Sequence, residues 1–337
     1  MSVTEKRRFC PICDAFFDVM VCPVDGVPTL DRAEFDATGD TLDPGRVLAD
    51  RYRIQRHLGR GGMGHVYLAS QTSINRLVAI KTLRRTVRGD RTALRRFYQE
   101  ARAAATLNHP NIVHIHDFCV DDLTGTPFIA MEYLDGSSLH SVLRTNGAVP
   151  EQVACKIAGG IARGLTEAHE QGIVHRDLKP GNIHLQRLSD GTDQVKVLDF
   201  GIAKVMSDAQ DPTEPITLAG VLMGTPHYMS PEQCNGRPVD YRGDLYALGC
   251  LLYHLLVGHP PFQGTADMGL LAAHANSPCP DLPDTLSDGQ APSGGLTAVY
   301  RALTAKAPDA RPASSLAVAN ALTLLARGAD HRGVGAF

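Results

Sequence analysis

Tryptophan is absent from this chain of 337 residues, and aromatic residues of all kinds make up only 6% of it. Long apolar runs are also missing. The longest, Leu245–Gly258, is shorter than the roughly 20 residues that cross a bilayer, so it indicates a buried helix and no membrane partner. The first ten residues carry charge but no apolar stretch typical of a secretory signal, and most cysteines have apolar neighbours; both features predict a cytoplasmic protein.

An excess of charge of one sign is lacking too. Lysine and arginine number 33, aspartate and glutamate 36, and the net charge of −3 argues against a protein that binds polyanions over its whole surface. One local basic run exists, but few aromatic residues lie within it. A solvated helix face is therefore favoured over a nucleic-acid patch, and we expect no nucleic-acid partner. The run consists of Arg84, Arg85, Arg88, Arg91, Arg95 and Arg96.

Five of the eight cysteines are isolated, and the other three have the spacing of metal ligands. Cys10 and Cys13 form a C-x-x-C pair, whereas Cys22 is followed three residues later by Asp25. Because zinc accepts both thiolate and carboxylate ligands, these four residues could hold one Zn²⁺ ion. The alternative is a metal-free hairpin packed by hydrophobic side chains, namely Phe9, Phe16, Phe17, Val19 and Val21.

Changes in composition and in hydrophobic pattern along the chain predict a small unit, a linker, a large domain and a tail. These are a Cys-containing segment at 1–30, an acidic linker at 31–51, a domain at 52–327 and a tail at 328–337. Alternating patterns predict strands early in the domain, and helical patterns dominate after residue 136. We therefore expect an α+β fold of two lobes, 52–134 and 135–327, with a cleft between them. The expected strands lie within 52–70, 76–83, 112–120 and 127–134, and the expected helices at 150–171, 244–258, 265–275, 296–305 and 313–326.

A glycine-rich stretch, LGRGGMGHVY, opens the domain with a G-x-G-x-x-G pattern. A dinucleotide-binding turn needs a helix after the third glycine and an acidic residue about 20 positions later, but here a strand pattern follows and Lys81 stands near that place. His65 occupies the position of the lysine of a Walker loop. A strand–turn–strand flap whose backbone approaches phosphates remains, with Gly59, Gly61, Gly62 and Gly64 in its turn.

Further motifs follow in a fixed order. VAIK ends at Lys81, and Glu100 stands on a predicted helix about 20 residues later. HRDLKPGN (175–182), LDFG with Asp199, and GTPHYMSPEQ (224–233) come next. In this order, over 52 to 327, the chain resembles the bacterial eukaryotic-like (Hanks-type) serine/threonine protein kinases. The resemblance implies a two-lobed kinase fold, ATP and Mg²⁺ as cofactors, and serine or threonine of proteins as substrates. Residues 9–27 are similar to zinc-ribbon segments that some of these kinases carry.

The resemblance also implies a role for each motif residue. Lys81 holds the α- and β-phosphates and pairs with Glu100, whereas Asp177 orients the substrate hydroxyl and accepts its proton. Lys179 neutralises the γ-phosphate, and Asn182 and Asp199 are the Mg²⁺ ligands. The adenine pocket is expected to consist of Leu58, Val66, Ala79, Met131, Glu132, Leu134 and Leu185, with the four glycines over the phosphates.

Other residues of the motifs are expected to hold the site in shape. His175 packs near Phe200, Asp244 braces the backbone of the HRD motif, and Glu232 pairs with Arg311, as in relatives. Lys179 after HRD-L and Thr225 in GTPxY favour serine/threonine over tyrosine as the acceptor.

The stretch between LDFG and GTP is polar and acidic, and Arg176 precedes the catalytic aspartate, as in kinases activated by phosphorylation. Thr217 is the predicted main autophosphorylation site, and Thr213 a secondary one.

Two other functions compete with that of a protein kinase. A pseudokinase would have lost Lys81, Asp177 or Asp199, and none is lost; a small-molecule kinase is disfavoured by GTPHYMSPEQ, which shapes a peptide-docking segment.

Overall fold

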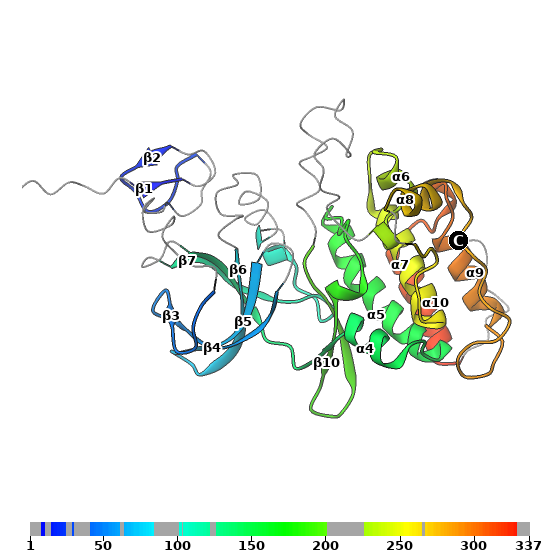
Figure 1. Ribbon diagram of the computed structural model, residues 1–337, viewed down its shortest axis with the longest axis horizontal. Helices are drawn as coiled ribbons and strands as arrows, with labels where there is room; N and C mark the ends of the chain where they lie inside the picture. The colour runs from blue at the N-terminus through cyan, green and yellow to red at the C-terminus, as the bar shows by residue number, and fades with distance from the viewer. Residues whose placement is uncertain are drawn as a thin grey trace, which may run out of the picture. The chain divides into compact units, whose positions relative to one another are not determined.

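A computed structural model describes residues 8–10, 15–24, 29, 41–60, 64–83, 101–102, 104–121, 126–200, 226–264 and 267–328 (Figure 1). The chain forms two compact units. The first, here called the sheet unit, comprises residues 1–106 and 113–134. The second, the helical unit, comprises residues 107–112 and 135–337.

The sheet unit is built on a six-stranded antiparallel sheet with the order β3-β4-β5-β6-β8-β7. Tyr52, Tyr67, Val78 and Phe128 are buried on one face of it, because side chains alternate between the two faces of a strand. That face carries the hydrophobic core of the unit. The strands are β3 (Val47–Leu48), β4 (Tyr52–Arg60), β5 (Gly64–Gln71), β6 (Arg76–Leu83), β7 (Ile115–Asp121) and β8 (Thr126–Glu132).

Strand β3 corrects the predicted linker at 31–51. Leu48 of β3 is fully buried in the sheet core, and the backbone N–H of Ala49 donates to Asp121 Oδ1 at 2.9 Å. The linker prediction is therefore wrong for residues 47–51. The glycine, proline and acidic residues around this short strand gave the segment the composition of a linker. Residues 31–40 lie outside the described part of the chain.

The helical unit contains every helix that the sequence predicts there, with ends shifted by a few residues. The helices are α4 (Leu139–Asn146), α5 (Glu151–Glu170), α6 (Pro231–Cys234), α7 (Tyr241–Val257), α8 (Asp267–Asn276), α9 (Gly294–Leu303) and α10 (Ser315–Ala326). A three-stranded sheet of order β11-β10-β9 accompanies them, from β9 (Gly136–Ser138), β10 (Ile183–Arg187) and β11 (Asp193–Val197). Neither this sheet nor α4 and α6 was predicted, because these elements are short.

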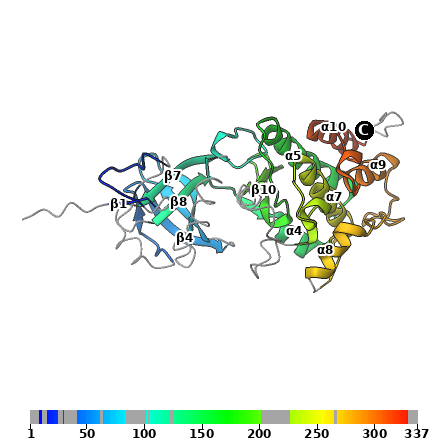
Figure 2. The same ribbon diagram turned by 90° about the horizontal axis from the view of Figure 1, so that it is seen from above.

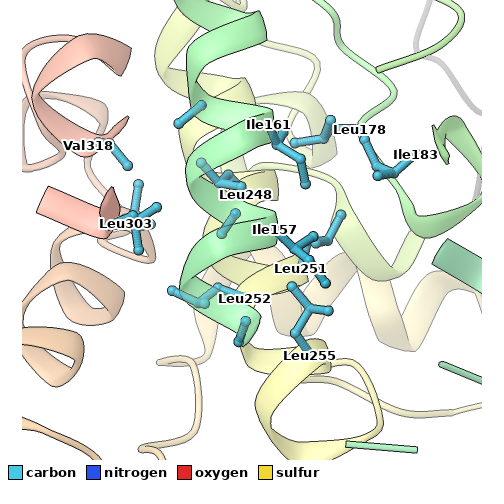
Figure 3. Close-up of a cluster of buried hydrophobic side chains, with 14 of the residues drawn as sticks. Ile157, Ile161, Leu178, Ile183, Leu248, Leu251, Leu252, Leu255, Leu303 and Val318 are labelled. Atoms are coloured by element: carbon cyan, nitrogen blue, oxygen red, sulfur yellow. The ribbon is translucent and has the colours of Figure 1, made fainter. Parts of the chain in front are cut away.

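Helix α7 is the centre of the helical unit. Its side chains are buried nearly all round, which explains why its sequence is almost entirely apolar. Helix α5 lies against both α7 and α10 (Figure 2). Figure 3 shows Ile157 and Ile161 of α5 beside Leu248, Leu251 and Leu252 of α7, with Leu178 and Ile183 close to them. Leu178 and Ile183, which flank Lys179 and Asn182, are therefore part of the hydrophobic core. Within the described residues, no helix is long and apolar enough to cross a membrane.

The N-terminal segment has little packing of its own. Strands β1 (Arg8–Phe9) and β2 (Phe16–Phe17) form a two-stranded antiparallel sheet. Phe16 and Val21 are each 54% exposed and Val19 is 49% exposed, whereas Cys10 and Cys22 are almost completely buried. The alternative of a hairpin packed by hydrophobic side chains is wrong for these three residues.

Candidate active site

The loop 175–182 brings together two predicted catalytic residues, Asp177 and Lys179, and the predicted Mg²⁺ ligand Asn182. Lys179 Nζ lies 2.6 Å from Asp177 Oδ2, and Asn182 Nδ2 donates to the same oxygen at 3.2 Å. Asn182 Nδ2 also donates to the backbone carbonyl of Asp177 at 2.9 Å, from the end of a short 3-10 turn, Pro180–Asn182. These bonds fix the direction of the Asp177 carboxylate.

The same contacts orient Asn182, one of the two predicted Mg²⁺ ligands, and a backbone bond links it to the residue before the other, Asp199. Because Nδ2 of Asn182 is occupied by Asp177, the amide oxygen Oδ1 is turned away from that residue. The backbone N–H of Leu198 donates to the Asn182 carbonyl at 2.8 Å and so ties the loop to Asp199, the next residue. Amide and carboxylate oxygens are ligands that Mg²⁺ accepts, so Asn182 and Asp199 fit this ion chemically.

Asp244 of α7 holds the loop from the core. Its carboxylate is 1% exposed and accepts the backbone N–H groups of His175 at 2.7 Å and Arg176 at 2.8 Å. Arg176 has a left-handed backbone with φ of 61°, which is costly for a residue other than glycine and needs such support. The predicted bracing role of Asp244 is confirmed.

His169 of α5 completes this anchor and was missed in the sequence. Its Nε2 lies 2.8 Å from Asp244 Oδ2, and its Nδ1 lies 2.6 Å from Ser315 Oγ. Burial alone would raise the pKa of Asp244, but the hydrogen bonds from His169 and from the His175 backbone hold it below its usual range. The one available signal was the position of His169 on the apolar face of the helix predicted at 150–171.

His175 has a structural role. Its Nδ1 accepts the backbone N–H of Asp177 at 3.2 Å, so the ring proton is on Nε2, which donates to the Leu198 carbonyl at 2.9 Å. The ring centroid lies 4.9 Å from that of Phe200. The predicted packing on Phe200 is confirmed. One ring nitrogen bonds within the loop, to Asp177, and the other links the loop to Leu198 of the LDFG motif.

A buried ion pair holds Glu232, near the end of the motif GTPHYMSPEQ. Arg311 Nη1 and Nη2 donate to the two carboxylate oxygens of Glu232 at 2.7 and 2.9 Å, as predicted. Burial would raise the pKa of Glu232, but these hydrogen bonds lower it below the usual range. Gln233, which the sequence did not single out, donates from Nε2 to the Arg176 carbonyl at 2.9 Å. The motif GTPHYMSPEQ and the HRD motif are thus directly bonded.

In the sheet unit, the strand register places four predicted nucleotide-binding residues on one face. Val66 pairs with Lys81, and Ala79 pairs with Met131. Val78, which alternates with them, belongs to the hydrophobic core on the opposite face. Val66, Ala79, Lys81 and Met131 therefore line the face away from that core, here called the outer face. Glu100, the predicted partner of Lys81, lies outside the described residues.

The glycines of LGRGGMG have different reasons to be glycine. A Cβ on Gly64 would lie 1.5 Å from the Thr82 carbonyl oxygen, so the close approach of β5 to β6 requires glycine there. In the described part of the chain, no atom lies within 4 Å of a Cβ built on Gly59. Leu58 stands at a register shift in β4 and is 36% exposed. Gly61 and Gly62 lie outside the described residues.

The remaining predicted adenine contacts lie at the end of β8 and in β10. The backbone N–H of Glu132 donates to the His114 carbonyl at 2.9 Å, and Glu132 Oε1 accepts the His114 N–H at 2.8 Å. The carbonyl of Glu132, rather than its N–H, is thus the backbone group that it could offer. Leu134 follows β8 and is half-buried; Leu185 is a buried residue of β10. The predicted phosphorylation sites Thr213 and Thr217 and the predicted specificity residue Thr225 lie outside the described residues.

The predicted zinc ligands are only partly visible. Cys10 and Cys22 are 0% and 1% exposed, whereas Cys13 and Asp25 lie outside the described residues. Among the residues that the structure describes, no group of three or more His, Cys, Asp or Glu side chains could hold a metal ion. Two buried thiols beside exposed phenylalanine and valine side chains fit the donor chemistry of a structural zinc site.

The chain is similar in sequence to known protein kinases. The family model for the protein kinase domain matches residues 52–319. The serine/threonine-protein kinase pkn3 of Myxococcus xanthus is 40% identical over 271 residues, which are 80% of this chain and 49% of that protein. Pkn1 of the same organism is 42% identical over 306 residues, covering 88% of this chain and 43% of that protein. The chain therefore spans less than half the length of these two relatives.

A solved structure shows the same fold. The kinase domain of PknI from Mycobacterium tuberculosis superimposes with a TM-score of 0.61 at 30% sequence identity. The match covers 84% of this chain and 98% of that one. The sheet unit and the helical unit described above correspond to a β-sheet lobe and a helical lobe, as expected from the order of the sequence patterns.

Proposed function

The chain belongs to the protein kinase family, with a kinase domain of the serine/threonine type, and on that premise we propose that the whole protein transfers the γ-phosphate of ATP to serine and threonine side chains of other proteins. The observation that carries the proposal is the cluster of Asp177, Lys179 and Asn182, bonded to one another and braced by buried Asp244. Positioning and charge supply most of the rate in phosphoryl transfer, and this loop supplies both.

Each residue of the loop has a task in that reaction. Asp177 orients the acceptor hydroxyl and accepts its proton, since a carboxylate held in one direction can act as a general base. Lys179, already 2.6 Å from Asp177, carries positive charge to the side of the loop where the γ-phosphate moves. Lys81 on the outer face binds the phosphates nearer the nucleoside. Asn182 and Asp199 hold Mg²⁺, which neutralises phosphate charge when bound.

The chain also phosphorylates itself in this proposal. Thr217 and Thr213 remain the predicted acceptors, and a phosphate there would pair with basic side chains such as Arg176. Phosphopeptide mapping of ATP-treated protein tests it. We expect Thr217→Ala to remove most of the incorporated phosphate and to lower activity; full activity in a Thr213→Ala/Thr217→Ala variant would contradict it.

A zinc ion bound by Cys10, Cys13, Cys22 and Asp25 is a further part of the proposal. Its support is the burial of Cys10 and Cys22 where the neighbouring hydrophobic side chains are exposed, since a metal can replace a core in so small a segment. Metal analysis should find about one zinc per chain, reduced in Cys22→Ser.

We also propose a cytoplasmic location, supported by the buried reduced thiols of Cys155 and Cys250.

The catalytic proposal is tested with Asp177→Asn. Transfer of labelled phosphate from ATP to a serine-containing protein should fall about 10²- to 10⁴-fold, while a nucleotide analogue still raises the melting temperature. The matched control is Asp190→Asn, because Asp190 is exposed and its carboxylate accepts hydrogen bonds from its near neighbour Thr192. Undiminished transfer in Asp177→Asn would refute the assignment. A wild-type chain that binds nucleotide without transfer would establish the pseudokinase.

A further inference from the structure

A second group of reactive side chains lies in the helical unit, away from the loop 175–182. The loop after α8 places the half-buried Cys279 against Tyr246 of α7, with Sγ 3.4 Å from the hydroxyl. Lys306 Nζ lies 3.9 Å from the same sulfur. Cys250, one turn of α7 beyond Tyr246, is buried within hydrogen-bonding reach of Cys279. We call these residues, with His274, the thiol cluster.

The contacts around Cys279 favour its thiolate. Lys306 Nζ is fixed by the Tyr246 hydroxyl and the His274 carbonyl, both at 2.9 Å, so its ammonium group stays beside the sulfur. The Cys250 thiol, the Tyr246 hydroxyl and Lys306 together lower the pKa of Cys279 to about 6, against burial, which raises it. The nearest carboxylate along the chain, Asp281, is paired with Arg301 at 2.9 Å. A half-buried thiol beside a fixed cation is the environment of a reactive cysteine.

Three other thiols, those of Cys119, Cys155 and Cys250, differ from Cys279 because their pKa values are raised. Burial and the neighbouring Asp117 raise the pKa of Cys119 to about 11, although Arg51 Nη2 lies 2.7 Å from its sulfur. Burial raises the pKa of Cys155 to about 12. Cys250 also has a raised pKa, caused by its complete burial. A cation close to a thiol is thus not sufficient, because in Cys119 a carboxylate opposes it.

We propose that Cys279 is an oxidant-sensitive modification site, which hydrogen peroxide converts to a sulfenic acid and which the neighbouring Cys250 then captures as a disulfide. In the first step the Cys279 thiolate attacks one peroxide oxygen. The O–O bond breaks, the sulfur is oxidised, and the leaving hydroxide takes up a proton to become water. In the second step the Cys250 sulfur attacks the Cys279 sulfur. The S–O bond breaks, and the hydroxyl leaves as water with the proton of Cys250.

Oxidation would act through Tyr246 on Glu232 of the motif GTPHYMSPEQ, which is expected to shape the peptide-docking segment. The Tyr246 ring lies 5.1 Å from the guanidinium of Arg311, which in turn holds Glu232. A disulfide at Cys279 removes the thiolate that faces Lys306 and pulls on both Tyr246 and the loop after α8. Lowered kinase activity after oxidation is the expected consequence; this part rests on the proposed function, whereas the chemistry of the thiols does not.

The test begins with the wild-type full chain and needs no variant. Alkylation by iodoacetamide, followed by peptide mass spectrometry, should label Cys279 at neutral pH about ten-fold or more faster than Cys119, which is the matched control within the same molecule. The rate at Cys279 should rise with pH around a midpoint near 6. Equal labelling of the two cysteines would overturn the proposal.

Peroxide then tests the product. Wild type should give a peptide pair joined through Cys250 and Cys279, reversed by dithiothreitol. The Cys250→Ser variant should instead accumulate sulfenic acid at Cys279, trapped by dimedone, and Cys279→Ser should give neither product. Absence of either wild-type disulfide or trapped sulfenic acid overturns the proposal. Because these readouts do not use kinase activity, they remain decisive even if the proposed function fails.

Discussion

The catalytic loop of the helical unit and the outer face of the sheet unit are positioned by different means. Side chains deep in the core hold the loop: Asp244 bonds the backbone of His175 and Arg176, and His169 bonds Asp244. On the sheet, strand register alone sets Lys81 beside Val66 and Ala79 beside Met131. An irregular loop therefore depends on a few polar contacts, whereas a sheet face depends on backbone spacing shared by many residues.

The largest effect is expected from substitution of Asp244, which holds the catalytic loop but not the sheet. In Asp244→Ala, two backbone N–H groups and His169 lose their buried acceptor, so we expect the free energy of unfolding to fall by about 3–5 kcal/mol. Phosphate transfer should fall about 100-fold or more, because the loop that positions Asp177 loses its brace. Urea unfolding and initial rates measure the two effects.

Asp240→Ala is the matched control for this change. Asp240 caps the same helix, α7, but its carboxylate is exposed and accepts the Arg242 N–H. Its loss should cost about 1 kcal/mol and leave the rate nearly unchanged. Equal effects of the two substitutions would show that Asp244 only starts the helix and does not hold the loop.

The sheet is tested next at its closest backbone approach. In Gly64→Ala, the new Cβ would meet the Thr82 carbonyl oxygen at 1.5 Å, so β5 and β6 must separate. We expect a loss of about 1–3 kcal/mol in the free energy of unfolding and a higher KM for ATP, because Val66 and Lys81 share that register. Gly59→Ala, which meets no atom within 4 Å, should unfold like wild type.

The two faces of β6 provide a smaller and more selective test. Ala79→Leu enlarges a side chain on the outer face and should raise the KM for ATP about ten-fold, close to 1.4 kcal/mol of binding free energy. Val78→Ala, on the core face, should lower stability by about 2 kcal/mol and leave that KM unchanged. A reversed pattern would place the nucleotide on the other face of the sheet.

The motif residues and the positions of the long helices could be read from the sequence because both are local signals. The helix at 244–258 is an example. The contacts of His175 with Phe200 and of Glu232 with Arg311 are not local, and they were expected from the resemblance to kinases and not from any pattern in the sequence. His169 and Gln233 were missed, since their partners lie 75 and 57 residues away and a long-range polar contact leaves no periodic trace. Strand β3 was missed because two residues are too few to show alternation.

Acid should weaken the helical unit through the half-buried His254 and the buried His274. Burial lowers the pKa of His254, which lies 2.6 Å from the Tyr228 hydroxyl, and of His274 to about 4, whereas the unfolded chain titrates near 6.5. Above that value both states are neutral and the stability is complete; as the pH falls toward 4, the unfolded state alone binds protons and stability is lost.

Each histidine should account for about 1 kcal/mol of lost unfolding free energy between pH values of about 7 and 5.5. Urea unfolding at the two pH values measures the loss, and His254→Gln, which keeps an acceptor for Tyr228, should remove about half of it. Hydrogen exchange should show the helices opening before the six-stranded sheet, because the acid-sensitive pair lies in α7 and α8. An unchanged pH dependence in His254→Gln would mean that the pKa of this histidine is the same in the folded and the unfolded chain.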